Sequence, residues 1–171
     1  MKKILFISFS CCILFSLMAK AQRIETLLEK NWKFTKGEVA EAMKPEFDDR
    51  KWETVTVPHD WAIFGPFDRS NDLQEVAVTQ NFEKKASVKT GRTGGLPYVG
   101  IGWYRTTFDA PADQQTTLVF DGAMSEAHVY VNGQEACFWP FGYNSFHCDV
   151  TGLLNKDGKN NTLAVRLENK P

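Results

Sequence analysis

Residues 127–138 read Ala-His-Val-Tyr-Val-Asn-Gly-Gln-Glu-Ala-Cys-Phe, and this stretch decides the fold class. Two runs rich in β-branched and aromatic residues flank Asn132-Gly133. That dipeptide favours a type I′ turn, because both of its positions can adopt a positive φ. The pattern therefore predicts a β-hairpin with strands at 127–131 and 134–138.

Short runs of the same kind lie on both sides of this hairpin and are bounded by turn residues. Residues 162–167 alternate most clearly, with Leu163, Val165 and Leu167 on one side and Ala164 and Arg166 on the other, which predicts a half-buried strand. Helix signals are limited to a short turn at 24–30 and a one-turn helix or tight turn at 48–51. The chain is therefore predicted to be all-β, a sandwich or a barrel. The other predicted strands are 52–57, 103–108, 116–120 and 145–150, with a further candidate at 75–82.

Length and charge narrow the class of protein. The chain has 171 residues, of which 43% are hydrophobic, so it can bury the core of one domain. Lysine and arginine number 20 against 21 acidic residues, and this balance lacks the basic excess of a nucleic-acid-binding protein. We therefore expect no nucleic-acid partner.

The first residues have the pattern of a secretory signal peptide. Lys2 and Lys3 precede an apolar run at 4–18, and Ala19-Lys20-Ala21 fits a cleavage site. We predict a signal peptide over 1–21, cleaved between Ala21 and Gln22. The expected product is secreted or periplasmic, without stable membrane insertion after cleavage. An uncleaved anchor is the alternative, although the run is shorter than the ~20 residues that span a bilayer.

Two cysteines follow this leader, Cys137 and Cys148, one on each side of the same expected loop. In an oxidising compartment they could form one disulfide. The alternative is that both are small buried apolar residues, because spacing alone does not show facing geometry.

Sequence motifs of catalysis are missing. The chain has no nucleophile elbow, zinc-binding helix motif, phosphate loop or dinucleotide fingerprint. His59, His128 and His147 share no metal-ligand spacing, and no pair of carboxylates is marked for glycoside hydrolysis. We therefore expect no metal and no cofactor, and predict no catalytic residue in this chain.

Five clusters, taken in order, nonetheless resemble one family. They resemble the N-terminal sugar-binding domain of glycoside hydrolase family 2, and most of all the β-galactosidase branch of gut-type bacteria. The resemblance covers residues 31–171 and implies a jelly-roll, galactose-binding-like β-sandwich over 22–171. The clusters are Val-Pro-His-Asp-Trp at 57–61 with Gly-Pro-Phe-Asp at 65–68, Gly-Ile-Gly-Trp-Tyr-Arg-Thr-Thr-Phe at 100–108, Phe-Asp-Gly at 120–122 with Val-Tyr-Val-Asn-Gly at 129–133, Gly-Tyr-Asn-Ser-Phe at 142–146 with Asp-Val-Thr at 149–151, and Asn-Thr-Leu-Ala-Val-Arg-Leu at 161–167.

The resemblance also implies what this chain does not carry. In that family the two catalytic glutamates lie on a TIM barrel, which follows an immunoglobulin-like domain, and no glutamate here matches either of them. The full-length protein is thus expected to be a retaining glycoside hydrolase, and this chain alone is expected to be inactive. Its expected partners are those two domains and a β-galactoside-type carbohydrate. We also expect a fragment or truncated product whose sandwich lacks its last strand.

The resemblance offers candidate sugar contacts after Trp61, because family sandwiches can send a loop to the first sugar subsite. Asp68, Arg69 and Asn71 are the candidates. The surrounding stretch 66–99 could be such a binding loop or only a surface insertion. His59, Asp60 and Trp61 either belong to this site or form a packed turn in which Asp60 accepts backbone N–H groups.

The expected positions of three further residues bear on the possible roles of the domain. Trp103 is expected in the core, whereas Arg105 is expected to face outward and bind a carboxylate of a neighbouring domain. Trp139, in an aromatic loop that the sequence leaves exposed, would serve the alternative function of a stand-alone, non-catalytic carbohydrate-binding module. A third interpretation is a sandwich that only supports its neighbours.

Overall fold

The computed structural model describes residues 23–65, 67, 74–79, 81–91 and 98–169, and these residues form an all-β protein. The predicted signal peptide and its cleavage site at Ala21–Gln22 lie outside the described residues. None of the described residues forms a helix with the length and apolar character needed to cross a bilayer. The elements are β1 (Trp32–Lys36), β2 (Glu53–Val55), β3 (Gln74–Val78), β4 (Ser87–Gly91), β5 (Ile101–Phe108), β6 (Thr117–Phe120), β7 (Ala127–Val131), β8 (Gln134–Trp139), β9 (Phe146–Asp149), η2 (Thr151–Leu153) and β10 (Asn161–Glu168).

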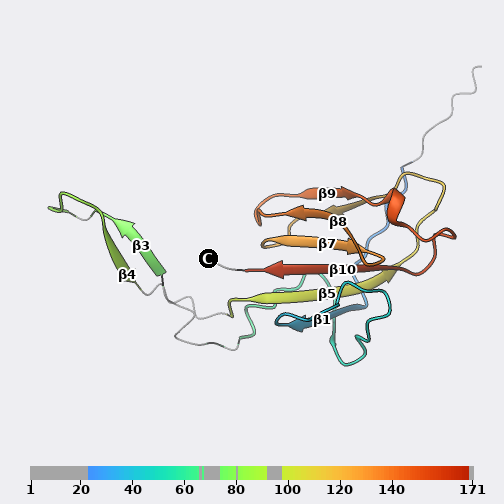
Figure 1. Cartoon of the computed structure of the whole chain (residues 1–171), viewed down its shortest axis with the longest axis horizontal. Coiled ribbons are helices and arrows are strands. Elements are labelled where there is room, and N and C mark those ends of the chain that lie inside the picture. The colour runs from blue at the N-terminus through green and yellow to red at the C-terminus, as the bar shows by residue number, and fades with distance from the viewer. Residues whose placement is uncertain (1–22, 66, 68–73, 80, 92–97, 170–171) are drawn as a thin grey trace, which may run out of the picture.

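The strands of the described part of the chain form one large and two small antiparallel sheets. The large sheet has six strands in the order β2-β1-β5-β10-β7-β8, and β6 pairs with β9 in a second layer. Figure 1 shows the β3–β4 hairpin apart from this sandwich. The predicted all-β sandwich is confirmed.

The β7–β8 hairpin forms where the sequence predicts it. Asn132 and Gly133 have φ angles of 50° and 81°, the left-handed values that the expected turn requires. The side chain of Asn132 also donates to the carbonyl oxygen of Leu153 at 2.8 Å, which ties the turn to the η2 segment. Local turn chemistry thus fixes the edge of the large sheet.

The strand β10 is buried on both faces, so the prediction of a half-buried strand was incomplete. Leu163, Val165 and Leu167 belong to the main core between the two layers. On the opposite face, Ala164 is fully buried with Trp103 in a second apolar cluster. Segment 38–52 covers this outer face, and the alternation of residues within a single strand does not reveal such a cover.

The position of Arg105 differs from its prediction. The residue does not face outward toward a neighbouring domain, because its side chain is only 3% exposed. Its Nε lies 2.9 Å from Asp49 Oδ2, and its Nη1 donates to the carbonyl oxygens of Ala42 and Lys44. Arg105 therefore anchors segment 38–52 to the sheet.

Several predicted boundaries also differ from the structure. The strand predicted at 52–57 is limited to β2, because the chain turns away there and Val57 N donates to Glu29 O at 2.8 Å. The helical turn predicted at 24–30 is wrong, since 23–29 have no regular structure, and 48–51 form a turn. Strand β1 was missed, although Trp32 and Phe34 alternate with polar residues there.

The structure joins Cys137 of β8 to Cys148 of β9, with a Cα–Cα distance of 5.8 Å. Cys137 lies on the edge strand of the large sheet, and Cys148 is buried in the core. The bond therefore links the two layers of the sandwich.

Candidate functional site

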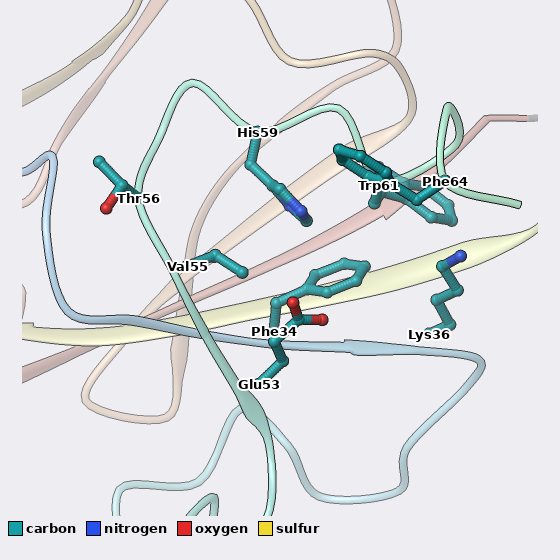
Figure 2. A pocket seen from close by; sticks show the side chains of 8 residues that line it. All are labelled: Phe34, Lys36, Glu53, Val55, Thr56, His59, Trp61 and Phe64. Carbon is teal, nitrogen blue, oxygen red and sulfur yellow. The ribbon is translucent and has the colours of Figure 1, made fainter.

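A pocket opens at the edge of the sandwich, between strands β1 and β2 and the segment 56–65. It has a volume of about 330 Å³, and Figure 2 shows aromatic and charged side chains around the same hollow. Phe34 and Lys36 are two residues apart on β1, and Glu53 and Val55 are two residues apart on β2, so each pair projects from one face of its strand. The lining residues are Phe34, Lys36, Glu53, Val55, Thr56, His59, Trp61 and Phe64.

A packed turn forms one wall of this pocket. Asp60 Oδ1 accepts hydrogen bonds from the backbone N–H groups of Ala62 at 3.1 Å and Ile63 at 3.3 Å, as the turn interpretation predicts. The turn buries Trp61, which is 5% exposed, and leaves the ring of Phe64 78% exposed. Asp60 is therefore a structural residue of the turn, and Phe64 is the aromatic group presented to solvent.

The floor of the pocket is an aromatic cluster around Tyr104. His59 Nδ1 lies 2.9 Å from Tyr104 Oη, and the ring of Phe34 contacts both side chains. Burial, reinforced by the negative charges of Asp60 and Glu53, raises the pKa of Tyr104 above its usual value. Tyr104 therefore remains a neutral phenol whose hydrogen bond fixes the His59 ring.

A second set of aromatic contacts surrounds Trp61, another residue that lines the pocket. Trp61 packs on Phe34 and Tyr98, with ring centroids 5.8 Å and 5.6 Å apart. The ammonium group of Lys36 donates to the Gly65 carbonyl oxygen and lies 5.2 Å from the centroid of the Tyr98 ring. These contacts position a cation beside apolar ring faces.

The pocket has the chemistry of a binding site and lacks the chemistry of glycoside hydrolysis. Apolar ring surfaces suit the C–H faces of a sugar, and the Lys36, Glu53 and His59 side chains offer hydrogen bonds to hydroxyl groups. Of the eight lining residues only Glu53 has a carboxyl group, whereas glycoside hydrolysis uses two. The described residues also contain no group of three His, Cys, Asp or Glu side chains that could hold a metal ion.

The predicted site residues are only partly brought together. His59 and Trp61 line the pocket, while Trp103 is buried in the core at 1% exposure, as expected. Asp68, Arg69 and Asn71, the predicted sugar contacts, lie outside the described residues.

Sequence reasoning missed six of the eight lining residues, namely Phe34, Lys36, Glu53, Val55, Thr56 and Phe64. Lys36 could have been found from the alternation of the unrecognised strand β1, which places it on the same face as Phe34. No sequence signal brings Glu53 to that face, because its position depends on the register that pairs it with Phe34.

The aromatic loop after β8 also differs from its prediction. Trp139 is not an exposed platform, because its ring stacks on Phe146 at 5.6 Å and its Nε1 donates to Asn144 Oδ1 at 3.0 Å. Phe141 and Tyr143 are the exposed rings, at 55% and 80%. The prediction of an exposed aromatic loop at 139–141 is therefore confirmed for Phe141 and wrong for Trp139.

Comparisons with known proteins identify the domain. Residues 101–171 match the family described as glycosyl hydrolase 2 galactose-binding domain-like. The chain is 34% identical over 161 residues to the β-galactosidase BoGH2A of Bacteroides ovatus, covering 92% of this chain and 17% of that protein. The structure of a glycosyl hydrolase family 2 member from Bacteroides cellulosilyticus has a TM-score of 0.66 and 30% identity, covering 85% of this chain and 18% of that one.

A second solved structure, the β-glucuronidase of Bacteroides uniformis, has a TM-score of 0.62 and 29% identity over 85% of this chain and 14% of that one. The chain therefore spans only a small part of each relative, 14% to 18% of these three proteins. It corresponds to their N-terminal domain. With its all-β sandwich, this chain belongs to the galactose-binding-like N-terminal domains of glycoside hydrolase family 2.

Proposed function

We propose that this chain is the N-terminal accessory domain of a secreted bacterial β-glycosidase that hydrolyses terminal β-glycosides with retention. The observation that carries the proposal is the match of 92% of this chain to only 17% of a β-galactosidase. The two catalytic carboxylates would lie in the part of such an enzyme that this chain does not match. The immunoglobulin-like and TIM-barrel domains expected there are the partners of this domain.

The proposed substrate is a β-galactoside, and a β-glucuronide is the competing choice. The first is supported by the relative named as a β-galactosidase and the second by the structure named as a β-glucuronidase. The two sugars differ at C4, where the hydroxyl group is axial in galactose and equatorial in glucuronic acid, and at C6, where glucuronic acid has a carboxylate in place of the hydroxymethyl group. A panel that contains both nitrophenyl glycosides therefore distinguishes them directly.

We assign to this domain the role of contacting the sugar at the edge of the active site. The pocket at 56–65 leads in sequence into Asp68, Arg69 and Asn71, whose polar side chains suit sugar hydroxyl groups. If these three residues bind substrate, replacing each with alanine in the longer enzyme raises KM. Variants that change only kcat would argue against direct contact.

The test of the main proposal begins with the intact mass of the protein from its native source. A product longer by a barrel of about 250 residues is expected. That product should hydrolyse one of the two nitrophenyl glycosides, while the 171-residue chain releases no nitrophenol. Hydrolysis by the 171-residue chain, or a mass equal to that of residues 22–171, would contradict the proposal.

The stand-alone carbohydrate-binding module is the second candidate, and the exposed Phe64 ring in the pocket favours it. In that case the 171-residue chain itself would bind a β-linked oligosaccharide. Titration calorimetry should then show that Phe64→Ala abolishes binding and that Phe82→Ala, an exposed ring outside the pocket, does not.

A further inference from the structure

Three apolar side chains are held in solvent at one end of the sandwich. Met124 is 44% exposed, Phe141 55% and Tyr143 80%, and the two rings lie 5.6 Å apart. The backbone of Gly142 packs so closely on Met124 that an added Cβ would come within 2.8 Å of its Cγ. The turn after β6 and the loop after β8 therefore bring the three residues into one surface, named here the 124/141/143 patch.

The frame beneath the patch is fixed. The N–H of Glu126 donates to the Pro140 carbonyl oxygen at 3.3 Å, and Trp139 is held by Phe146 and Asn144 as described above. The bond between Cys137 and Cys148 closes the base of the same loop. An apolar surface kept exposed on a well-supported frame is typical of a contact surface, because binding there costs little ordering.

The patch lies where β10 ends. Ser125, the neighbour of Met124, accepts a hydrogen bond from Glu168 N at 2.9 Å, and its hydroxyl donates to Glu168 O at 2.7 Å. Glu168 is the final residue of β10. Figure 1 shows the loop between β8 and β9 at the same end as the end of β10 and the C-terminus.

We propose that the 124/141/143 patch is the docking surface for the domain that follows this sandwich in the longer protein. This inference rests on the proposed function. The relatives continue well beyond the matched part, which is 17% of the β-galactosidase and 18% of the B. cellulosilyticus structure. Because Ser125 pairs with Glu168, the polypeptide that continues from β10 starts beside the patch, at this end of the sandwich. The contacting surface of the next domain is expected to be apolar at the centre and polar at the rim.

Hydroxyl-radical footprinting tests the inference without any substitution. The 171-residue chain and the longer native product are oxidised under the same conditions, and side-chain modification is measured by mass spectrometry. In the longer product, oxidation of Met124, Phe141 and Tyr143 should fall about fivefold, as at the core of an interface. Phe138, which is 44% exposed on β8, and Leu27, which is 80% exposed, serve as internal controls and should not change.

The outcomes separate the possible occupants. Equal oxidation of the patch in both proteins would overturn the docking surface while leaving the proposed function intact. Protection that appears in the 171-residue chain as its concentration rises would assign the patch to a second copy instead. Protection by added oligosaccharide would assign it to a glycan. Lack of any longer native product would overturn the proposed function itself, and the docking inference with it.

A paired substitution provides the complementary test. Phe141→Ser with Tyr143→Ser in the longer product should split its thermal unfolding into two transitions, because the domains lose their contact. Phe138→Ser is the matched control and should keep one transition. A single transition in both variants would contradict docking at the patch.

Discussion

At the residue scale, two neighbouring ion pairs show that the contribution of an ion pair to stability depends on its burial. Arg105 pairs with Asp49 at 2.9 Å and has a side chain only 3% exposed, whereas Arg50 pairs with Asp48 at 2.7 Å with side chains 87% and 54% exposed. An exposed pair is screened by water, but a buried cation that loses its partners has no replacement for them. The two pairs therefore form a matched comparison.

Replacing Arg105 with alanine should lower the free energy of unfolding by about 3–5 kcal/mol, because Asp49 and two backbone carbonyl groups lose their buried donor. Arg50→Ala is the control and should leave the urea midpoint unchanged. Urea unfolding followed by tryptophan fluorescence measures both. Equal effects from the two variants would show that segment 38–52 does not depend on Arg105.

The raised pKa of Tyr104 predicts how the stability of the folded protein changes at alkaline pH. The folded-state pKa of this residue is raised, mainly by burial, above the usual tyrosine value of 10.0. Above about pH 10 the unfolded chain therefore releases this proton more readily than the folded protein does. The stability due to the neutral phenol is fully present below that pH and is lost as the pH rises through the folded-state pKa.

The measurement is the urea midpoint at pH 8.5 and at pH 10.5, compared between the wild type and Tyr104→Phe. Phenylalanine lacks the ionisable hydroxyl, so the variant should lose less stability between the two pH values, although it starts lower without the His59 contact. An equal loss in both proteins would assign the alkaline sensitivity to other groups.

At the element scale, the two layers are held together most directly where β8 and β9 meet. The edge strand β8 and the second-layer strand β9 are joined by Cys137 and Cys148, which are 11 residues apart in sequence. Cross-linking restricts the unfolded chain more than the folded one. The bond should therefore contribute to the stability of the sandwich and of the loop that carries Phe141 and Tyr143.

Replacing both cysteines with serine should lower the free energy of unfolding by about 3 kcal/mol, the cost expected for a closed loop of this length. Thermal unfolding of the wild type with and without reductant gives the same comparison without substitution. If reductant leaves the melting temperature of the wild type unchanged, the bond does not stabilise the protein.

Two glycines near the end of the chain differ in whether a larger side chain would fit in their place. Gly158 has a φ of +70°, and a Cβ there would overlap the Ala110 carbonyl oxygen, whereas a Cβ at Gly152 would meet nothing within 4 Å. Gly158→Ala should therefore destabilise the protein by about 2 kcal/mol or more, through both strain and overlap. Gly152→Ala should change the unfolding midpoint little, and similar midpoints for the two variants would contradict this assignment.

At the scale of the whole molecule, the core is built by the sandwich and its covering segments. Among the side chains whose burial is described in segment 74–91, Ala77, Thr79 and Phe82 are exposed. Figure 1 shows that the β3–β4 hairpin lies apart from the large sheet. Folding of the sandwich and a binding role of residues 66–99 can therefore be separated by experiment.

Replacing residues 68–97 with a short glycine-serine linker should change the melting temperature by less than about 3 °C, because the residues of the two described core clusters all lie outside this segment. Calorimetry on the 171-residue chain and the shortened chain measures this. In the longer enzyme, the same excision should raise KM if the segment contacts sugar and leave it unchanged if the segment is a surface insertion. Loss of cooperative unfolding would show that this segment is part of the core.

Sequence patterns were sufficient to predict the all-β class, seven of the strands of the sandwich and the hairpin turn at Asn132-Gly133. The sequence also offered the packed turn at Asp60 as one of two interpretations and, through ordered motifs, indicated the family. These features depend on local signals, namely alternation over a few residues, turn residues with positive φ and short motifs. Strand β1 was within reach of the same reasoning.

Long-range contacts, which sequence patterns do not reveal, bury Arg105 and Ala164, pack Trp139 and bring Glu53 into the pocket with His59. Burial of the outer sheet face depends on segment 38–52, which lies far from Arg105 and Ala164 in sequence. The pocket likewise depends on the register between β1 and β2. Alternation within a strand gives the two faces of that strand, but the segment that covers each face is set by contacts between residues distant in the chain.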